Sequence, residues 1–369
     1  MSATAICAAQ DFQSAVKAAV KGVTGQSQQP VQNCLLLEVE GQTMHLTGTD
    51  LEVSVTTSVP LYRDYGRWQA AVPGRVVSEL APLLGPSDII LAAEEGHALN
   101  VESAGSHFTF KGWPAADFCK LPPPNGESIT TSLLQETLRT SLSQVAPAAS
   151  TDSTRPALSA VLFDQTESEL DLVSTDTYRL AAGKVFGGAK QATSPLLPHR
   201  TANILRALLD HDGLKHVVIT TSPTNIRFDL GNTIVDGRLV EGTPFNWRGV
   251  LPDALPTRIT IRREALVDGL SRVWPLTRDD TGGVHLRASG QTLHLSIGEE
   301  GMVGTADESL LATCVGPDYE RSFNVSYLRQ ALTAIKAEYV VLTCGGEGPL
   351  VLTAEDDESY RHVIMPRMF

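Results

Sequence analysis

Three stretches of the sequence repeat one pattern of apolar residues at intervals of about 125 residues. In each stretch apolar residues recur at positions i, i+3, i+4 and i+7, the spacing of a helix that packs on one side. Pro73 and Pro198 stand near two of the starts, where a proline costs a helix nothing. The repeat therefore predicts three copies of one domain. The stretches are residues 72–84, 197–209 and 323–335.

Each copy adds a second helix and several strands to this helix. Short β-branched runs separated by turn residues predict a hairpin after each repeated helix. The runs are residues 88–92 and 98–102, 216–220 and 225–229, and 339–343 and 350–353. An amphipathic helix is also expected near the start of each copy, at residues 12–20, 133–142 and 265–273.

These units are α+β domains, with helices packed on antiparallel sheets. Proline and glycine gather at residues 121–126 and 251–256, which suggests boundaries there. We therefore expect domains at residues 1–124, 125–253 and 254–369. Similar units can join edge to edge, and a head-to-tail join that closes makes a ring without free sheet edges. From the repeat alone, the simpler interpretation is three tandem domains in a row.

Composition limits the partners of the chain. It has 369 residues, 42% of them hydrophobic, which is ample for globular domains. The net charge is −13, whereas a protein that binds nucleic acid over its whole surface is normally basic. A nucleic-acid partner would therefore require positive charge to be gathered on one face.

The cysteines and the apolar runs indicate a compartment. The five cysteines are scattered and form no C-x-x-C pair, which favours free thiols over a disulfide frame or a metal site. No basic start is followed by an apolar run, and no run reaches ~18 apolar residues. We expect a cytoplasmic protein with no membrane association, no metal and no cofactor.

Enzyme motifs are absent from the sequence. There is no G-x-S-x-G and no H-E-x-x-H, and residues 183–190 fail the spacing of a phosphate-binding loop. Asp50 and Asp176 occupy equivalent positions of the repeat, which indicates a turn role through side-chain to backbone hydrogen bonds. We therefore predict that the chain is not an enzyme, since a hydrolase would need a nucleophile and base that cannot be found.

Several stretches, in this order, resemble the bacterial DNA sliding clamp family, the β subunit of the replicative DNA polymerase III holoenzyme. The resemblance covers essentially the whole chain, and its divergences suggest a divergent or accessory member. The stretches that carry it are Leu46–Glu52, Phe108–Phe118, Ser174–Ala181, Phe323–Tyr327 and His362–Phe369.

The resemblance implies a homodimeric ring of three-domain chains joined head to tail. Such a ring encircles duplex DNA without sequence preference and tethers the replicative DNA polymerase as a processivity factor. Polymerase, clamp loader and repair proteins bind it through short peptide motifs, and it has no catalytic activity. The alternative is a non-replicative peptide-binding scaffold that keeps the fold.

In such a ring, basic residues on the lining helices would face DNA, held through phosphates and water. The alternative for each residue is an ordinary solvated helix face. The candidates are Lys17, Lys21, Arg75, Arg139, Arg200, Arg206, Arg262, Arg263, Arg272, Arg329 and Lys336.

The resemblance also implies a partner-peptide pocket between the second and third domains. Methionines and apolar walls with a few polar groups suit a short peptide. An apolar tail packed into the last domain is the alternative for the final residues. The carried-over wall is Leu158, Thr175, Thr177, Tyr178, Arg179, Leu180, Phe245, Val250, Val363, Met365, Pro366, Arg367, Met368 and Phe369.

Some of these positions depart from the family's usual residues. Phe245 stands where proline is common, Gly249 where arginine is common, and Thr177-Tyr178 where Gly-His is usual. The ending also differs. We therefore expect a pocket of altered shape and altered peptide preference.

For ring closure, the resemblance implies that Phe108 and Phe110 of one chain meet Leu276 and its neighbours of the other. The segment Phe108-Thr-Phe110 alternates as an edge strand should, so pairing across subunits is physically reasonable. The alternative is that these phenylalanines belong to the ordinary core.

Overall fold

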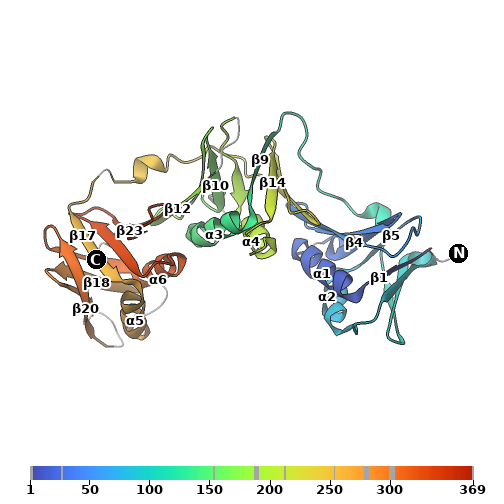
Figure 1. Cartoon of the computed structure of the whole chain (residues 1–369), viewed down its shortest axis with the longest axis horizontal. Coiled ribbons are helices and arrows are strands. Elements are labelled where there is room, and N and C mark those ends of the chain that lie inside the picture. Colours follow the sequence, from blue (N-terminus) through green and yellow to red (C-terminus); the bar gives the residue numbers. More distant parts are fainter. Residues whose placement is uncertain are drawn as a thin grey trace. The chain divides into compact units, whose positions relative to one another are not determined.

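The computed structural model has the predicted α+β architecture of helices packed on antiparallel sheets (Figure 1). By contacts the chain forms two compact units, residues 1–139 with 200–239, and residues 140–199 with 240–369. The residues that the structure describes are 3–25, 28–152, 154–186, 191–211, 213–252, 254–277, 282–298 and 304–367.

Six α-helices lie in the described part of the chain, at the places that the repeat predicts. The expected second helix of each copy is α2, α4 or α6, and the expected first helix is α1, α3 or α5. Their bounds are α1 Ala9–Ala19, α2 Gly74–Leu80, α3 Gln135–Val145, α4 His199–Leu208, α5 Arg263–Val273 and α6 Val325–Ala334.

Among the described residues, eight strands follow the same order in each copy of the repeat. The first copy has β1 Ala3–Cys7, β2 Cys34–Glu40, β3 Thr43–Thr49, β4 Val53–Pro60, β5 Arg67–Pro73, β6 Ile89–Ala93, β7 Ala98–Ser103 and β8 Ser106–Lys111. The second has β9 Ile129–Leu134, β10 Ala160–Gln165, β11 Glu169–Thr175, β12 Arg179–Phe186, β13 Leu196–Pro198, β14 His216–Thr221, β15 Asn225–Asp229 and β16 Thr233–Arg238. The third has β17 Thr257–Arg262, β18 Gly283–Ser289, β19 Thr292–Ile297, β20 Ala306–Val315, β21 Tyr319–Asn324, β22 Tyr339–Cys344, β23 Leu350–Ala354 and β24 Tyr360–Ile364.

In the first unit one sheet continues from the first copy into the second. Its strand order is β5-β2-β3-β4-β16-β15-β14-β9, and a separate sheet has the order β1-β6-β7-β8. The continuation is the antiparallel pair of β4 with β16, in which Val55 lies opposite Val235. We call this pair the first junction.

In the second unit a twelve-stranded sheet joins the second copy to the third. Its order is β13-β10-β11-β12-β24-β23-β22-β17-β20-β19-β18-β21. The pair of β12 with β24, in which Ala181 lies opposite His362, is the second junction.

The amphipathic helices bury one face against these sheets. In α1 the buried side chains include Phe12 and Val16, in a core cluster with strand residues such as Leu37. Gly48 on β3 permits this approach, because a Cβ there would lie 2.2 Å from the carbonyl oxygen of Ala19. The core of the first copy thus lies between its helix α1 and its sheets.

Candidate functional site

The strand β11 runs into β12 through a turn that Asp176 holds. Its Oδ1 accepts hydrogen bonds from the backbone N–H of Tyr178 and of Arg179, both at 3.0 Å. Asp50 holds the equivalent turn between β3 and β4, accepting from Glu52 at 3.0 Å and from Val53 at 2.8 Å. The turn role predicted for both aspartates is confirmed.

The turn also demands an unusual backbone conformation. Thr177 has φ 78° and its counterpart Leu51 has φ 72°, in the left-handed region that side chains rarely adopt. Thr175 supports the turn, because its Oγ1 donates to the carbonyl oxygen of Arg179 at 2.7 Å. Since both turns carry the same strain, the strain belongs to the turn and not to a ligand site.

Beyond the turn, alternate side chains of β12 point to opposite faces of the sheet. Leu180 lies opposite Val363 of β24, and both are almost fully buried, at 2% and 1% exposed. They share an apolar cluster with Trp247, against which Phe245 packs. The second junction thus brings Leu180 and Val363 together with Trp247 and Phe245 in one apolar cluster. This cluster lies on the sheet face that points away from the helices, which we call the outer face.

Arg179 lies on the other face, among helices. Its guanidinium donates to Oε1 of Gln330 at 2.5 Å and to Asp176 Oδ2 at 2.9 Å, and also bonds the carbonyl of Pro147. Its Cζ lies 4.2 Å from the centre of the Tyr327 ring. This predicted wall residue therefore ties β12 to α6 beneath the sheet.

The rim of the predicted pocket is exposed. The exposed fraction is 66% for Tyr178, 50% for Val250 and 42% for Met365. The backbone N–H of Met365 donates to the carbonyl of Tyr178 at 2.9 Å, which joins the two sides of the rim. Thr177 is also exposed there. Large exposed apolar side chains around a buried apolar floor are typical of a peptide-binding surface.

The remaining predicted wall residues that the structure describes are not part of the apolar cluster of Leu180 and Val363. Leu158 and Pro366 are half-buried, and the N–H of exposed Arg367 donates to the carbonyl of Ser322 at 2.8 Å. Met368 and Phe369 lie outside the described residues.

The segment between β16 and β17 carries residues that the sequence analysis missed. Trp247 Nε1 donates to Asp164 Oδ2 at 2.8 Å, and Arg248 lies 2.8 Å from Asp171 Oδ2. Trp247, Arg248 and Asp171 border an open groove with Lys184 and other charged side chains of β11, β12, β24 and the loop before β24. A tryptophan in a proline-bounded linker was the available signal, because such a large apolar side chain needs a surface to cover.

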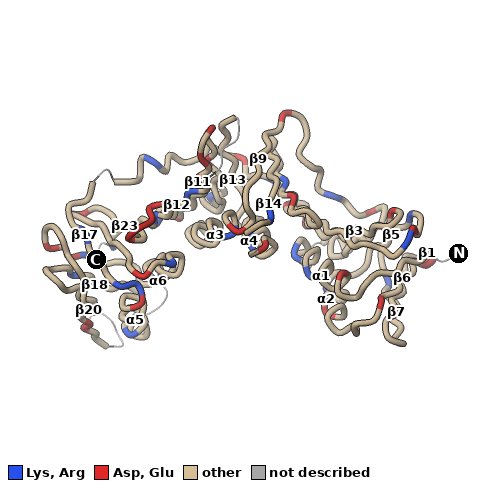
Figure 2. Tube along the Cα trace, in the orientation of Figure 1, with Lys and Arg blue, Asp and Glu red and all other residues tan. Residues whose placement is uncertain are grey.

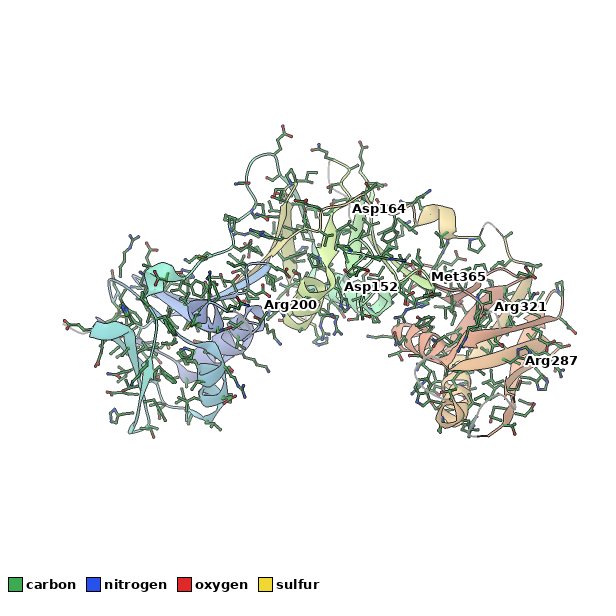
Figure 3. All side chains as sticks on the ribbon, turned by 180° about the vertical axis from the view of Figure 1, so that it is seen from behind. Asp152, Asp164, Arg200, Arg287, Arg321 and Met365 are labelled. Atoms are coloured by element: carbon green, nitrogen blue, oxygen red, sulfur yellow. The ribbon has the colours of Figure 1, made fainter. Side chains whose placement is uncertain are left out.

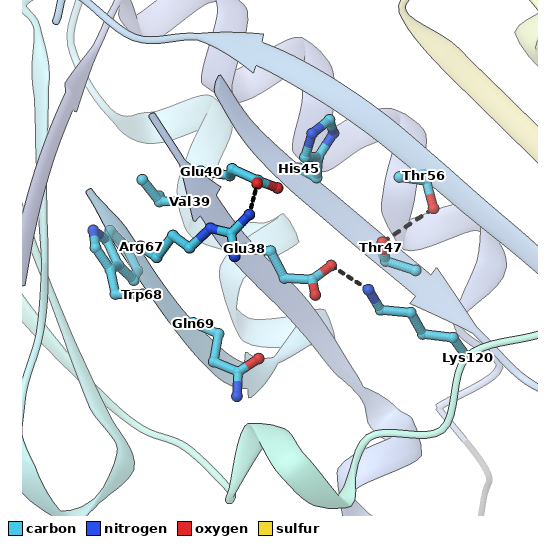
Figure 4. A pocket seen from close by; sticks show the side chains of 10 residues that line it. All are labelled: Glu38, Val39, Glu40, His45, Thr47, Thr56, Arg67, Trp68, Gln69 and Lys120. Carbon is cyan, nitrogen blue, oxygen red and sulfur yellow. Dashed lines mark hydrogen bonds and ion pairs between the residues drawn. The ribbon is translucent and has the colours of Figure 1, made fainter. Parts of the chain in front are cut away.

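A second groove crosses the outer face of the first copy (Figure 4). It is polar: Lys120 pairs with Glu38 at 2.5 Å, Arg67 pairs with Glu40, and the hydroxyls of Thr47 and Thr56 lie 3.0 Å apart. Its charged groups are paired with one another and its lining is mostly polar, unlike the apolar cluster at the second junction.

Each α-helix carries at least one lysine or arginine (Figure 2). Several of the predicted DNA-facing residues are already bound to carboxylates. Arg200 pairs with Asp50 at 2.8 Å, Arg272 with Glu308 at 2.5 Å, and Arg75 with Glu79 at 2.9 Å. Arg262 lies within 4 Å of two glutamates, Glu264 and Glu338.

Other predicted DNA-facing residues have different surroundings. Arg139 donates to the carbonyl of Arg206 at 3.2 Å, and the Arg329 guanidinium lies 4.8 Å from the Trp274 ring centre. Lys17 and Lys336 are exposed and make no ion pair within the described ranges. Lys21, Arg206 and Arg263 are half-buried.

Within the described residues no group of three or more histidine, cysteine, aspartate or glutamate side chains could hold a metal ion. All five cysteine thiols are free. None of the described helices is both long and apolar enough to cross a membrane.

Comparison with protein families gives three matches in chain order. Models of the N-terminal, central and C-terminal domains of the DNA polymerase III beta subunit match residues 4–122, 132–244 and 248–368. The chain belongs to the DNA polymerase III beta subunit family. The predicted family is thereby confirmed.

Curated relatives in this family carry the name beta sliding clamp. The chain is 27% identical to that of Vibrio cholerae over 93% of both chains. It is 28% identical to that of Escherichia coli K12, covering 91% of this chain and 92% of the relative. Identities in this range make the chain a divergent member.

Solved structures of this family share the fold. A sliding clamp from Pseudomonas aeruginosa bound to griselimycin has a TM-score of 0.94 at 25% identity, covering 100% of both chains. The beta subunit of Thermotoga maritima has a TM-score of 0.92 at 21% identity, covering 99% of both chains, and supports the fold alone.

The predicted ring-closing residues of this family member lie at sheet edges and helix ends. Phe110 on β8 is buried in the core with Phe12, and Phe108 is half-buried against the same cluster. Leu276 follows α5 in a short 3-10 helix, Trp274–Leu276, and is half-buried. Within one chain Phe110 is therefore a core residue, as the alternative interpretation expected. Its role between chains stays a prediction.

Proposed function

We propose that this chain is a DNA sliding clamp subunit. Two copies would form a head-to-tail ring that encircles duplex DNA in the cytoplasm and tethers the polymerase, without catalysis. The observation that carries the proposal is the repeated edge-to-edge sheet joining at the two junctions. A third equivalent joining, made between each chain and its partner and so twice in the dimer, would close the ring. The domains would be residues 1–124, 125–253 and 254–369.

The repeat predicts which two strands would pair when one chain joins its partner. In the junctions the fourth strand of one copy, β4 or β12, pairs with the eighth strand of the next, β16 or β24. The fourth strand of the third copy is β20 and the eighth of the first is β8. Ring closure would therefore pair β20 with β8 of the partner chain, which carries Phe108 and Phe110.

The register follows from equivalent positions. Residues 41–46, Gly-Gln-Thr-Met-His-Leu, recur as Gly-Gln-Thr-Leu-His-Leu at 290–295. By this alignment Gly48 corresponds to Ile297, so Val55, opposite Gly48, corresponds to Ala306, opposite Ile297. In the repeated hairpins, Ile219 pairs with Phe228 and Phe228 with Val235, as Leu91 pairs with Val101 and Val101 with Phe108. Val235 therefore corresponds to Phe108. The proposed closure thus sets a small side chain opposite a large one, as Ala181 lies opposite His362.

A cross-link tests this closure. The substitution C119S first removes the exposed thiol of the chain. In that background, a chain with both F108C and A306C should form a covalent dimer on oxidation, because each cysteine meets the other one on the partner chain. The matched control F108C with L311C moves one cysteine out of register and should not. A monomer in sedimentation, or equal cross-linking in the control, contradicts the proposed register.

The second part of the proposal is partner binding. We infer that the apolar floor of Leu180 and Val363, with its exposed rim, takes short apolar peptide motifs of polymerase, clamp loader and repair proteins. A fluorescent peptide with Gln-Leu-x-Leu-Phe should bind the full chain at micromolar concentration, and a variant ending at Pro366 should not bind. Equal binding by both proteins would move the site away from the tail.

The DNA role is separable from partner binding. If the chain encircles DNA, it should be retained on nicked circular duplex after loading and lost when the DNA is made linear. Affinity for linear duplex should be weak and fall steeply with salt, because phosphates are held by the helices' basic residues. Tight, salt-resistant binding to linear duplex contradicts encirclement and would favour a scaffold.

A further inference from the structure

The linker between the second and third copies is anchored to the outer face of the second copy. Trp247 is only 8% exposed and lies in the apolar cluster with Leu180 and Val363. Asp164, labelled in Figure 3, projects from β10 to meet this linker. The anchor therefore adjoins the proposed peptide site.

Asp164 collects three donors. Trp247 Nε1 donates to Oδ2 at 2.8 Å, Ser194 Oγ donates to Oδ1 at 2.9 Å, and the Arg248 guanidinium pairs with Oδ2. Burial alone would raise the pKa of Asp164, but these donors hold the pKa below its ordinary value. The carboxylate is thus ionised, and its Oδ2 is bound to the linker.

Arg248 spans two carboxylates. Besides Asp164 it binds Asp171 on β11, and its Nη2 lies 2.8 Å from Oδ2 of that carboxylate. Its Cζ lies 4.3 Å from the centre of the Trp247 ring. A planar guanidinium that bridges two carboxylates and stacks on an aromatic ring has little freedom. We call Asp164, Asp171, Trp247 and Arg248 the linker clasp.

The clasp is connected to two predicted pocket residues by the backbone. The N–H of Trp247 donates to the carbonyl of Phe245 at 2.9 Å, and the N–H of Val250 donates to the carbonyl of Trp247 at 3.1 Å. Moving the tryptophan would therefore move Phe245 and Val250 relative to the sheet that carries Leu180.

We propose that Asp164 and Arg248 are positioning residues for partner binding. They would hold the linker segment with Phe245 and Val250 at a set distance from Leu180 and Val363 of the sheet. Binding of a peptide would then cost no further conformational entropy for ordering that segment. This inference rests on the proposed partner site and adds residues that do not themselves touch the peptide.

The first copy supplies an internal control. Glu38 lies opposite His45 across β2 and β3, as Asp164 lies opposite Asp171 across β10 and β11. Glu38 binds Lys120, which lies in the linker between β8 and β9, but in a polar groove. K120A therefore removes an equivalent linker contact that has no apolar site beside it.

The experiment measures binding of the Gln-Leu-x-Leu-Phe peptide by fluorescence polarisation, with melting temperatures, in full-length variants. R248A should weaken binding about tenfold, mainly through faster dissociation, because the linker wall loses its fixed position. W247F, which keeps an aromatic ring but removes the indole N–H, should weaken it a few-fold. R248K should recover part of the affinity, whereas K120A should stay within about twofold of the unaltered chain.

Binding by R248A and W247F within twofold of an unaltered chain that binds would overturn the positioning role and leave the partner site standing. An equal loss in K120A would show a general stability effect and overturn the role as well. Failure of the unaltered chain to bind the peptide would overturn the partner site itself, and this inference with it.

Discussion

The two sheet junctions share a backbone plan and differ in their outer faces. Both begin at an aspartate-held turn, and both pair the fourth strand of one copy with the eighth of the next. At the first junction the outward pair is Ser54 with Asp236, and at the second it is Leu180 with Val363. One plan thus carries a polar face and an apolar one.

The neighbouring strand completes the difference. At the first junction Arg227 of β15 lies opposite Asp236 and holds it through two hydrogen bonds of 2.7 and 3.0 Å. At the second junction Val351 of β23 lies opposite Val363. An ion pair with a buried carboxylate and a partly exposed guanidinium makes the first face polar, whereas the second stays apolar. If the proposed partner site is right, the outward side chains would decide which junction receives a peptide.

The largest expected effect comes from breaking the ion pair of the first junction. Burial raises the pKa of Asp236 despite Arg227, so its carboxylate depends on that partner. R227L should lower the free energy of unfolding by about 3 kcal/mol, and R227L with D236V, which imitates the second junction, should recover most of it. Denaturant unfolding measures both. A double variant as unstable as R227L would show that the pair is not the reason.

The reverse change should disable the second junction. V363D puts a carboxylate on the apolar floor without an arginine opposite, and should weaken peptide binding about 50-fold. The milder L180S, which copies Ser54, should weaken it less. Fluorescence polarisation measures both, with sedimentation as a check on assembly. Unchanged affinity in V363D would place the site elsewhere.

The inward-facing pairs predict a difference in pH dependence. Burial lowers the pKa of His362 to about 3, whereas its counterpart Val235 does not titrate. Because the folded pKa lies below the unfolded value, stability is complete above about pH 6.5 and falls toward pH 3. At pH 5 the loss should be about 2 kcal/mol.

The pH dependence has a matched control. A181V with H362V installs the valine pair of the first junction and should flatten the stability profile between pH 6.5 and 5. Denaturant unfolding at several pH values measures this. An unchanged slope in the double variant would assign the pH dependence to other groups.

The smallest expected effect tests whether the strained turns are alike. T177G and L51G both place glycine at a positive φ and should each stabilise the chain by about 0.5 kcal/mol. Thermal unfolding compares them. A gain at Leu51 and a loss at Thr177 would mean that the threonine serves the second junction in a way the turn does not require.

Much of the fold was predictable from the sequence because the repeat carries it. Apolar spacing located the six helices, and the Thr-Asp pairs located both junction turns. The site was only partly predictable. That Arg179 turns beneath the sheet depends on strand alternation and on Gln330, far away in sequence. The linker clasp depends on Asp164 and Asp171 meeting across two strands, which no local pattern reveals.

The second junction also bears on the order in which the molecule folds. β12 ends at Phe186, but its pairing strand β24 is the last strand of the third copy of the repeat. Contacts so distant in sequence form late, because a long loop must close before they are gained. We expect β12 to remain an uncovered edge until the third copy has folded. A chain interrupted before β24 would lack half of the proposed peptide floor, so only a chain with a finished third copy could recruit partners.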